Sequence, residues 1–276
     1  MPPIIKILVI AEFSIAMVFS YWVLNRQMKL MKHQQGMENL KGKVVLITGA
    51  SSGLGEAFAH VFHKAGCRLV LAARREAELC RVRDDLIRIN PETAHPVVLN
   101  MDMLEHDKLP YLAQKSLEIY GHIDIFISNA GITTRCTIQD CGIEVHKKFM
   151  DVNYFGHVAL TKALLPSMLE RKTGHIVVIG SILGQISIPH RAPYSASKHA
   201  LQAFCDSLRA EVATMYTTNP GGMTAEYVAD RILHAVVSEE PELVIANFQH
   251  RILITIRKLF PNLYFSLMAY RAKTTN

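Results

Sequence analysis

The sequence predicts an α/β fold in which helices cover both faces of a doubly wound parallel sheet. Short apolar runs rich in β-branched residues alternate with helix-like segments between positions 43 and 213. Continuous apolar runs are typical of parallel strands buried on both faces, and the alternation is typical of strand–crossover–strand units. One such domain suits a chain of 276 residues, of which 50% are hydrophobic and 20% charged.

The expected elements follow one another in strand–helix order. Strands are expected at 43–49, 68–73, 96–102, 123–131 and 175–181. Helices are expected at 53–65, 76–89, 105–119, 144–171 and 194–213. Where the next strand is due, only TMYTTNPGGM separates Ala213 from a helix that begins near Thr224, and NPGG is typical of a turn. The sequence therefore predicts that the sixth strand is absent.

A membrane segment is expected before this domain. Residues 4–24 form a mostly apolar run that is long enough to cross a bilayer core of about 30 Å. Glu12 near its middle argues against a simple span, while Tyr21 and Trp22 suit the interface. A cleaved signal peptide is the alternative. Basic residues after the run favour a cytosolic domain.

The chain is accordingly divided into four parts. These are an uncleaved anchor at 1–25, a linker at 26–42, a single-domain body at 43–247 and an amphipathic segment at 248–276. The last part is expected either to rest on the bilayer as a flap or to pack on the end of the sheet.

Composition excludes several classes of protein. The cysteines are scattered and odd in number, which predicts free thiols and neither a disulfide framework nor a zinc site: Cys67, Cys80, Cys136, Cys141 and Cys205. The net charge of +6 comes from basic residues that are densest beside apolar segments, which favours contact with a membrane surface over nucleic acid.

A glycine-rich stretch, TGASSGLG at 48–55, ends the first strand and opens the first helix. Its glycines permit a tight turn and a close approach of the backbone, and the helix N-terminus offers N–H groups to a pyrophosphate. The alternative is a plain turn. The residues expected to hold a dinucleotide are Thr48, Gly49, Ser51, Ser52, Gly53, Leu54 and Gly55.

The end of the second strand selects the kind of dinucleotide. Proteins that bind NAD place an acid there to hold the ribose 2′-hydroxyl, and this chain has Ala73, Arg74 and Arg75 instead. The guanidinium of Arg74 would pair with a 2′-phosphate, so the sequence predicts NADP(H). The alternative is two solvated arginines at the start of a charged helix.

A candidate proton donor lies in YSASK at 194–198. Tyr194 and Lys198 share one face of a helix, and an ammonium beside a phenol lowers the pKa of the phenol. Such a phenol is able to give a proton to a carbonyl oxygen or take one from an alcohol. Ser181 adds a hydroxyl for the same oxygen, and Asn153 is a polar residue within an apolar helix. A helix cap or a satisfied buried amide is the alternative for each.

These motifs resemble those of the short-chain dehydrogenase/reductase family, and of its membrane-anchored members in particular. The matching residues are TGASSGLG, Asp102, NAG at 129–131, Asn153, Ser181 and YSASK, and the resemblance covers 41–213 and 222–271. It implies a Rossmann-type fold and a hydride moved between NADP(H) and a carbonyl or alcohol carbon. It also implies that a substrate flap after the sixth strand is missing here.

The resemblance implies a role for each matching residue. Tyr194 would be the acid/base, Lys198 would lower its pKa and hold the nicotinamide ribose, and Ser181 would orient the substrate oxygen. Asn153 would hold a water that relays protons to Lys198. Asp102 and Met103 would edge the adenine, and Asn129, Ala130 and Gly131 would line the cofactor.

The substrate is expected to be apolar. Leu183 and its neighbours make the loop after Ser181 apolar, and the anchor suggests a lipid-like carbonyl such as a steroid or retinoid, handled at the endoplasmic reticulum. The resemblance implies pairing of two copies through the helices at 144–171 and 194–213. The other hypothesis is a catalytically impaired relative that binds nucleotide and acts as a regulatory or interaction subunit, because a strand and flap are expected to be missing.

Overall fold

A computed structural model gives the structure of the protein. It describes residues 38–212, 215–220, 225–237, 242–245, 248–260, 263–264 and 267. The predicted anchor and most of the linker lie outside these residues. In the part of the chain that is described, no helix has the length and apolar character needed to cross a membrane.

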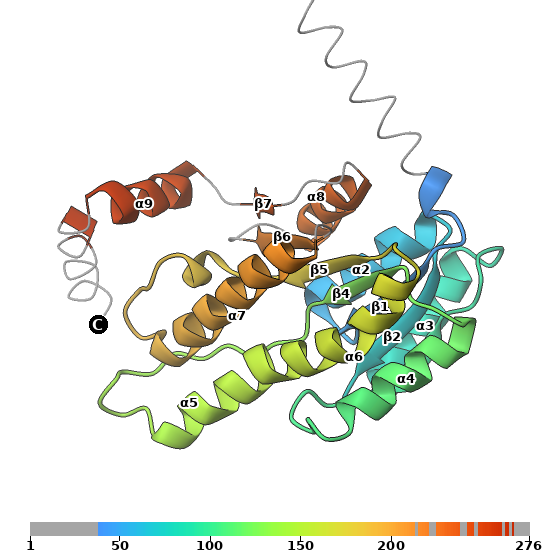
Figure 1. Ribbon diagram of the computed structural model, residues 1–276, viewed down its shortest axis with the longest axis horizontal. Helices are drawn as coiled ribbons and strands as arrows, with labels where there is room; N and C mark the ends of the chain where they lie inside the picture. The colour runs from blue at the N-terminus through green and yellow to red at the C-terminus, as the bar shows by residue number, and fades with distance from the viewer. Residues whose placement is uncertain are drawn as a thin grey trace, which may run out of the picture.

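The predicted doubly wound sheet is confirmed, and it contains seven parallel strands (Figure 1). Their order across the sheet is β3-β2-β1-β4-β5-β6-β7. Their bounds are β1 Val44–Thr48, β2 Arg68–Ala73, β3 Val97–Asn100, β4 Ile125–Ser128, β5 His175–Ile179, β6 Met215–Pro220 and β7 Glu242–Ile245.

Helices cover both faces of this sheet. Their bounds are α2 Gly53–Lys64, α3 Glu76–Ile89, α4 Leu109–Tyr120, α5 Ile143–Met150, α6 Gly156–Glu170, α7 Ala192–Glu211, α8 Ala225–Val237 and α9 Phe248–Leu259. A π-helical turn, Asp151–Phe155, joins α5 to α6, and a 3₁₀ turn, Ile182–Gly184, follows β5. Residues of α2, α3 and α8 pack on one face, and residues of α4, α6 and α7 pack on the other.

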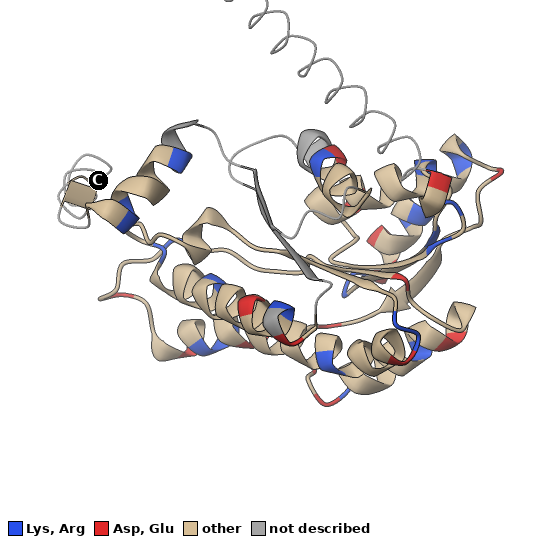
Figure 2. Ribbon diagram, turned by 45° about the horizontal axis from the view of Figure 1, so that its top comes forward, with Lys and Arg blue, Asp and Glu red and all other residues tan. Residues whose placement is uncertain are grey.

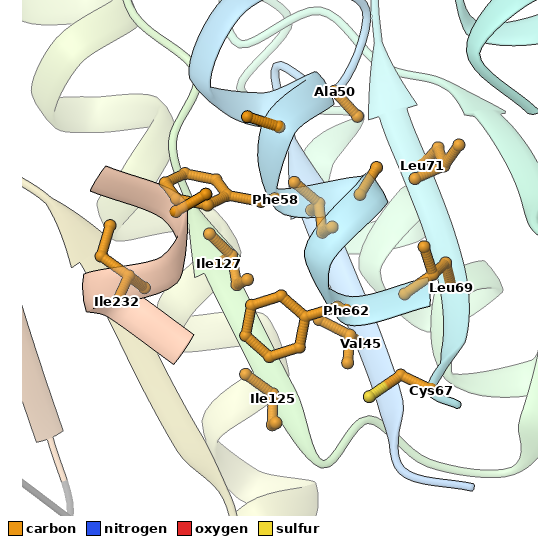
Figure 3. Packing of buried hydrophobic residues seen from close by; sticks show 14 of the residues in the cluster. Val45, Ala50, Phe58, Phe62, Cys67, Leu69, Leu71, Ile125, Ile127 and Ile232 are labelled. Atoms are coloured by element: carbon orange, nitrogen blue, oxygen red, sulfur yellow. The ribbon is translucent and has the colours of Figure 1, made fainter. Parts of the chain in front are cut away.

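Strand β1 shows why the sheet forms at the centre of the molecule. All five of its residues are buried, and successive side chains point to opposite faces. Val45 therefore joins the cluster that includes Phe58 and Phe62 of α2 and Ile232 of α8 (Figure 3), whereas Val44 joins the opposite cluster. The apolar run of the sequence is thus used on both sides.

The prediction that the sixth strand is absent is wrong. Residues 215–220, MYTTNP, form β6 between β5 and β7, with Ile176 opposite Met215 and Pro220 opposite Ile245. Six residues at about 3.3 Å each suffice for an ordinary strand, and the β-branched and aromatic residues of MYTT favour one. Proline is tolerated at the end of a strand. The strand also covers an edge of β5 that would otherwise be exposed.

The prediction of free thiols is wrong for two of the five cysteines. Cys136 and Cys141 are joined by a disulfide, with their Cα atoms 5.5 Å apart. Cys67, Cys80 and Cys205 are free thiols, as predicted, and burial raises the pKa of Cys67 and of Cys205 to about 12. Among the described residues, no group of three or more His, Cys, Asp or Glu could hold a metal ion.

Candidate active site

The glycine-rich stretch forms the tight turn predicted for it. Gly49 and Gly53 have φ angles of +68° and +59°, a region that side-chain-bearing residues rarely adopt. A methyl group at Gly55 would collide with the carbonyl oxygen of Gly49 and lie 2.8 Å from Nδ2 of Asn129. The turn and the start of α2 therefore pack together without room for a side chain.

Thr48 ties this turn to the end of β4. Its Oγ1 accepts hydrogen bonds from the backbone N–H groups of Asn129, at 3.0 Å, and Ala130, at 3.2 Å. The side-chain amide of Asn129 donates in return to the carbonyl oxygen of Thr48, at 2.9 Å. The ends of β1 and β4, which are neighbours in the sheet, are thereby held in one arrangement.

A cavity of about 250 Å³ opens at these strand ends. Ligands of open α/β sheets bind at the carboxyl ends of strands, which is where this cavity lies. Most of the residues predicted to hold the cofactor line it: Thr48, Gly49, Ser51, Ser52, Arg74, Asp102, Met103, Asn129, Ala130 and Gly131. Gly53, Leu54, Gly55, Tyr194 and Lys198 lie outside its lining.

Arg75 is a lining residue that the sequence did not single out. Its Nη2 donates to Oγ of Ser51 at 3.1 Å and to Oγ of Ser52 at 2.8 Å, which places the guanidinium on the glycine-rich turn. Arg74 instead forms an ion pair of 4.0 Å with Asp102. The Arg-Arg pair was the only signal in the sequence, and it did not indicate which of the two arginines faces the turn.

Asn153 is fully buried in the π-helical turn. Its Oδ1 accepts from the N–H of Ile132 at 2.8 Å, and its Nδ2 donates to the carbonyl of Ile132 at 3.0 Å and to Oγ of Ser197 at 3.1 Å. Ser197 donates in turn to the carbonyl of Tyr194 at 2.8 Å. The amide thus links the segment after β4 to the first turns of α7.

Lys198 is a buried ammonium close to the cavity wall. Its Nζ donates to the carbonyl of Ile179 at 2.9 Å, and burial lowers its pKa from 10.5 to about 8. A methyl group added at Gly131 would lie 4.0 Å from this Nζ and 3.2 Å from Oδ1 of Asn153. The loop after β4 therefore has no side chain at Gly131, the point that lies near the ammonium of Lys198.

Tyr194 and Ser181 lie at the start of α7 and just after β5. The ring of Tyr194 meets Phe149 edge-on, with centroids 6.5 Å apart. Oγ of Ser181 accepts from the N–H of Leu183 at 3.2 Å, which leaves its own O–H able to donate. Within residues 38–212, neither Ser181 nor Lys198 is hydrogen-bonded to the hydroxyl of Tyr194.

His157 on α6 is a second residue that sequence reasoning missed. Its Nε2 lies 2.7 Å from the carbonyl of Ala130, and its Nδ1 lies 2.5 Å from Oγ of Ser128. Because a carbonyl only accepts, the proton is on Nε2 and Nδ1 accepts from the serine. Burial lowers the pKa of this imidazole to about 3. A lone histidine in a helix gave no signal for this contact.

An apolar cluster lies against Tyr194. Leu183, Ile186, Ile254 and Tyr264 are its buried members, and Tyr194, Leu253 and Ile256 are packed against it. Helix α9 and Tyr264 therefore contact the loop after β5, and the hydroxyl of Tyr264 donates to the carbonyl of Ser187. Figure 1 shows α9 at the end of the molecule where α7 begins. Helix α9 thus packs against the loop after β5 and against Tyr194, and contact of this segment with a bilayer stays a prediction.

The family follows from the sequence as well as from the fold. Residues 43–232 match the family described as short chain dehydrogenase. The chain belongs to that family, whose members are oxidoreductases.

Two relatives cover most of the chain. "Dehydrogenase/reductase SDR family protein 7-like" of Drosophila melanogaster is 45% identical over 87% of this chain and 83% of that protein. "Dehydrogenase/reductase SDR family member 7B" of Mus musculus is 40% identical over 89% of this chain and 86% of that protein.

The alignments with both relatives contain positions that this chain does not fill. The fruit-fly alignment spans 271 positions, but 87% of this chain's 276 residues is about 240 residues. The mouse alignment spans 277 positions and takes in 89%, which is about 246 residues. About 30 positions of each alignment therefore face no residue here, although the strand that was expected to be missing is present.

Solved structures share the fold. An alcohol dehydrogenase from Thermococcus sibiricus in complex with 5-hydroxy-NADP has a TM-score of 0.69 at 23% identity, covering 74% of this chain and 96% of that one. A short chain dehydrogenase/reductase from Burkholderia phymatum in complex with NAD has a TM-score of 0.74 at 22% identity, covering 81% and 95%.

Proposed function

We propose that this protein transfers a hydride between NADP(H) and a carbonyl or alcohol of an apolar substrate, with Tyr194 as the acid/base. The observation that carries the proposal is the position of buried Lys198, whose Nζ lies behind Gly131 in the wall of the 250 Å³ cavity. A buried ammonium beside a dinucleotide cavity suits a residue that holds a ribose and favours the ionised form of a nearby phenol.

The glycine-rich turn fits the phosphates of a dinucleotide. A turn without side chains at Gly49 and Gly55 lets the backbone N–H groups that open α2 face a pyrophosphate, where the helix dipole favours negative charge. The bound cofactor would supply or accept the hydride. Asp102, Met103 and Asn129 to Gly131 would hold its adenine and nicotinamide halves.

The choice of NADP(H) rests on Arg75 as well as on Arg74. Arg75 faces the hydroxyls of Ser51 and Ser52, so its guanidinium and these two donors would converge on a ribose 2′-phosphate. No acid stands at the end of β2 to hold the 2′-hydroxyl of NAD. Solved relatives of the fold hold either dinucleotide, so the proposed preference rests on these side chains.

Four residues would serve the proton transfer: Tyr194, Ser181, Asn153 and Lys198. Ser181 would donate its O–H to the substrate oxygen, and Tyr194 would give the proton that the reduced oxygen takes up. Asn153 is hydrogen-bonded to Ile132 and Ser197, so it would hold the loop after β4 and the first turns of α7 in fixed relative positions. Lys198 would stabilise the phenolate left behind.

The substrate class follows from the cluster at Tyr194. Its members are aliphatic or aromatic, and one of them, Leu183, lies two residues after Ser181. Such a wall suits an apolar carbonyl, as in a steroid, retinoid or other lipid. Helix α9 carries Arg251, Arg257 and Lys258 and no acid (Figure 2), which suits an anionic membrane surface. We therefore keep the proposal of a protein anchored by residues 1–25, with the endoplasmic reticulum as its membrane and the domain on the cytosolic side.

An NADPH titration followed by a turnover assay tests this function. NADPH binding is measured by fluorescence, and apolar ketones are then added to the same sample. We expect Arg75→Ala to weaken NADPH binding by about 10- to 100-fold, the value of a charged hydrogen-bonded contact, while NADH binding changes little. Arg88→Ala, an exposed arginine of α3, is the matched control. Tyr194→Phe should keep binding and lose turnover; full turnover in this variant would remove Tyr194 from the chemistry.

The second candidate is a nucleotide-binding subunit with little activity of its own. The observation that favours it is the 30 or so unfilled positions of the relatives, because a lost flap would leave the substrate poorly shielded from water. Such a chain would act by pairing, through α6 and α7, with another copy or an active relative. Tight NADPH binding without turnover of any ketone, aldehyde or alcohol would favour this candidate.

A further inference from the structure

The loop between β4 and α5 is fastened to the beginning of the helix that carries Tyr194. The N–H of Cys136 donates to the carbonyl of His190 at 3.1 Å, and Nη1 of Arg191 donates to the carbonyl of Thr134 at 2.8 Å. His190 has a φ of +63°, a conformation that a non-glycine residue keeps only when its surroundings hold it. Residues 190 and 191 lie directly before α7, which begins at Ala192.

The same loop continues from the cofactor side of the site. It leaves Gly131, which lines the cavity, and passes Ile132, which is held on both backbone groups by Asn153. It therefore joins the cofactor side of the site to the first turn of α7, so its shape bears on where Tyr194 stands.

A disulfide closes this loop. Cys136 and Cys141 enclose four residues, and the N–H of Cys141 also donates to the carbonyl of Thr137 at 3.1 Å. Their Cα separation of 5.5 Å is the usual one for a disulfide. Both cysteines are half-buried and the residues between them, 137–140, are exposed, so a small thiol can reach them, whereas Cys67 and Cys205 are buried.

We propose that Cys136 and Cys141 form a thiol–disulfide exchange site that fixes the substrate side of the active site when it is oxidised. In the exchange, the two thiols lose two protons and two electrons and form one S–S bond, while the disulfide of oxidised glutathione accepts both and becomes two glutathione thiols. Excess reduced glutathione reverses the step. Disulfides of cytosolic proteins are usually transient or redox-sensing, which suits the proposed cytosolic domain.

The expected consequence is confined to the substrate side. The bond holds Cys136 where its N–H meets His190, so reduction should loosen this contact and the loop that carries it. The turn of Ser51, Ser52 and Arg75 lies on other strand ends, so NADPH affinity should not change. The effect on the KM for a ketone rests on the proposed function; the formation of the bond and its effect on the loop do not.

Peptide mapping and amide hydrogen exchange test the bond without turnover. Trypsin cuts after Arg135 and Lys147, so one peptide contains both cysteines. After incubation with oxidised glutathione, this peptide should be lighter by two hydrogens and resist alkylation. In reducing buffer, exchange of its amides and of residues 190–191 should become faster. A peptide that stays fully alkylated, or a bond that forms without any change in exchange, would overturn the proposal.

Variants then separate this site from the proposed function. The Cys136→Ser/Cys141→Ser double variant should behave as the reduced protein under both conditions. Cys80→Ser, a free thiol of α3, should respond as the wild type does. For an active enzyme, we expect reduction to raise the KM for a ketone by about 2- to 10-fold, the value of one hydrogen bond, at constant NADPH affinity. An equal KM in the two redox states would refute the coupling. Absence of all turnover would count against the proposed function, while hydrogen exchange would still decide on the exchange site.

Discussion

The neutral imidazole of His157 makes folding depend on pH in a way that one substitution removes. Burial lowers its pKa from 6.5 to about 3. The unfolded chain takes up this proton near pH 6.5, whereas the folded chain takes it up only near pH 3. Its contribution to stability is therefore full above pH 6.5 and is lost as the pH falls through this window. At pH 5, about 1.5 units below the unfolded value, the loss relative to pH 7 is about 2 kcal/mol.

Urea denaturation at pH 7 and pH 5 measures this loss. His157→Gln retains an amide N–H that can reach the carbonyl of Ala130, so the variant should fold. We expect the wild type to lose about 2 kcal/mol more than the variant between the two pH values. His95→Gln, at an exposed position, is the control and should lose as much as the wild type. Equal losses in the wild type and His157→Gln would show that the imidazole is not held neutral.

Two further substitutions test the turn and the base of the sheet. Gly55→Ala should abolish NADPH binding in a fluorescence titration, because its methyl group would meet the carbonyl of Gly49. Gly53→Ala has room for the methyl group and should lower the free energy of unfolding by only about 1–2 kcal/mol, because of its positive φ. Equal effects of the two variants on NADPH binding would contradict this packing. Asp124→Ala should lower the free energy of unfolding by about 3 kcal/mol, because it leaves Nη1 of Arg171 and the N–H of Val44 without their acceptor. The pKa of Asp124 is lowered despite its burial, by Val44, Lys43, His122 and Arg171, so the stability that its carboxylate contributes is lost in acid. The difference in free energy of unfolding between the wild type and Asp124→Ala should therefore become smaller at low pH in urea titrations. A difference that stays constant with pH would show that the charge of Asp124 does not stabilise the fold.

The first five strands were predictable because each has a strong local signal. VVLIT is short, rich in β-branched residues and has no polar residue before Thr48, which favours a buried strand, and all five of its residues are buried. The glycine-rich turn was equally predictable, since Gly49 has a φ of +68° and Gly55 lies against the carbonyl of Gly49, six residues before it. The roles of Ser181, Tyr194 and Lys198 stay predictions, since no contact among the described residues joins their reactive groups.

What the sequence did not reveal depends on contacts between distant segments. Arg75 and not Arg74 faces the turn because of how β2 ends against residues 51 and 52, and nothing local distinguishes the two arginines. Cys136 and Cys141 looked like scattered thiols because their spacing matches no framework. Strand β6 was missed because its apolar signal is short, whereas its place is fixed by the edges of β5 and β7.

The presence of β6 changes what the unfilled positions of the relatives imply. A missing strand would have broken the sheet between β5 and β7, and with it the packing of α8, whose Ile232, Leu233 and Val236 are buried with Phe58 and Phe62 of α2. That packing is intact, so we expect the cofactor side of the site to keep its shape. The apolar cover over Tyr194 comes from α9, Tyr264 and the loop after β5. We therefore expect NADPH affinity close to that of a longer relative together with a higher KM for the ketone. Weaker NADPH binding that accompanies the higher KM would place the deficit in the fold itself.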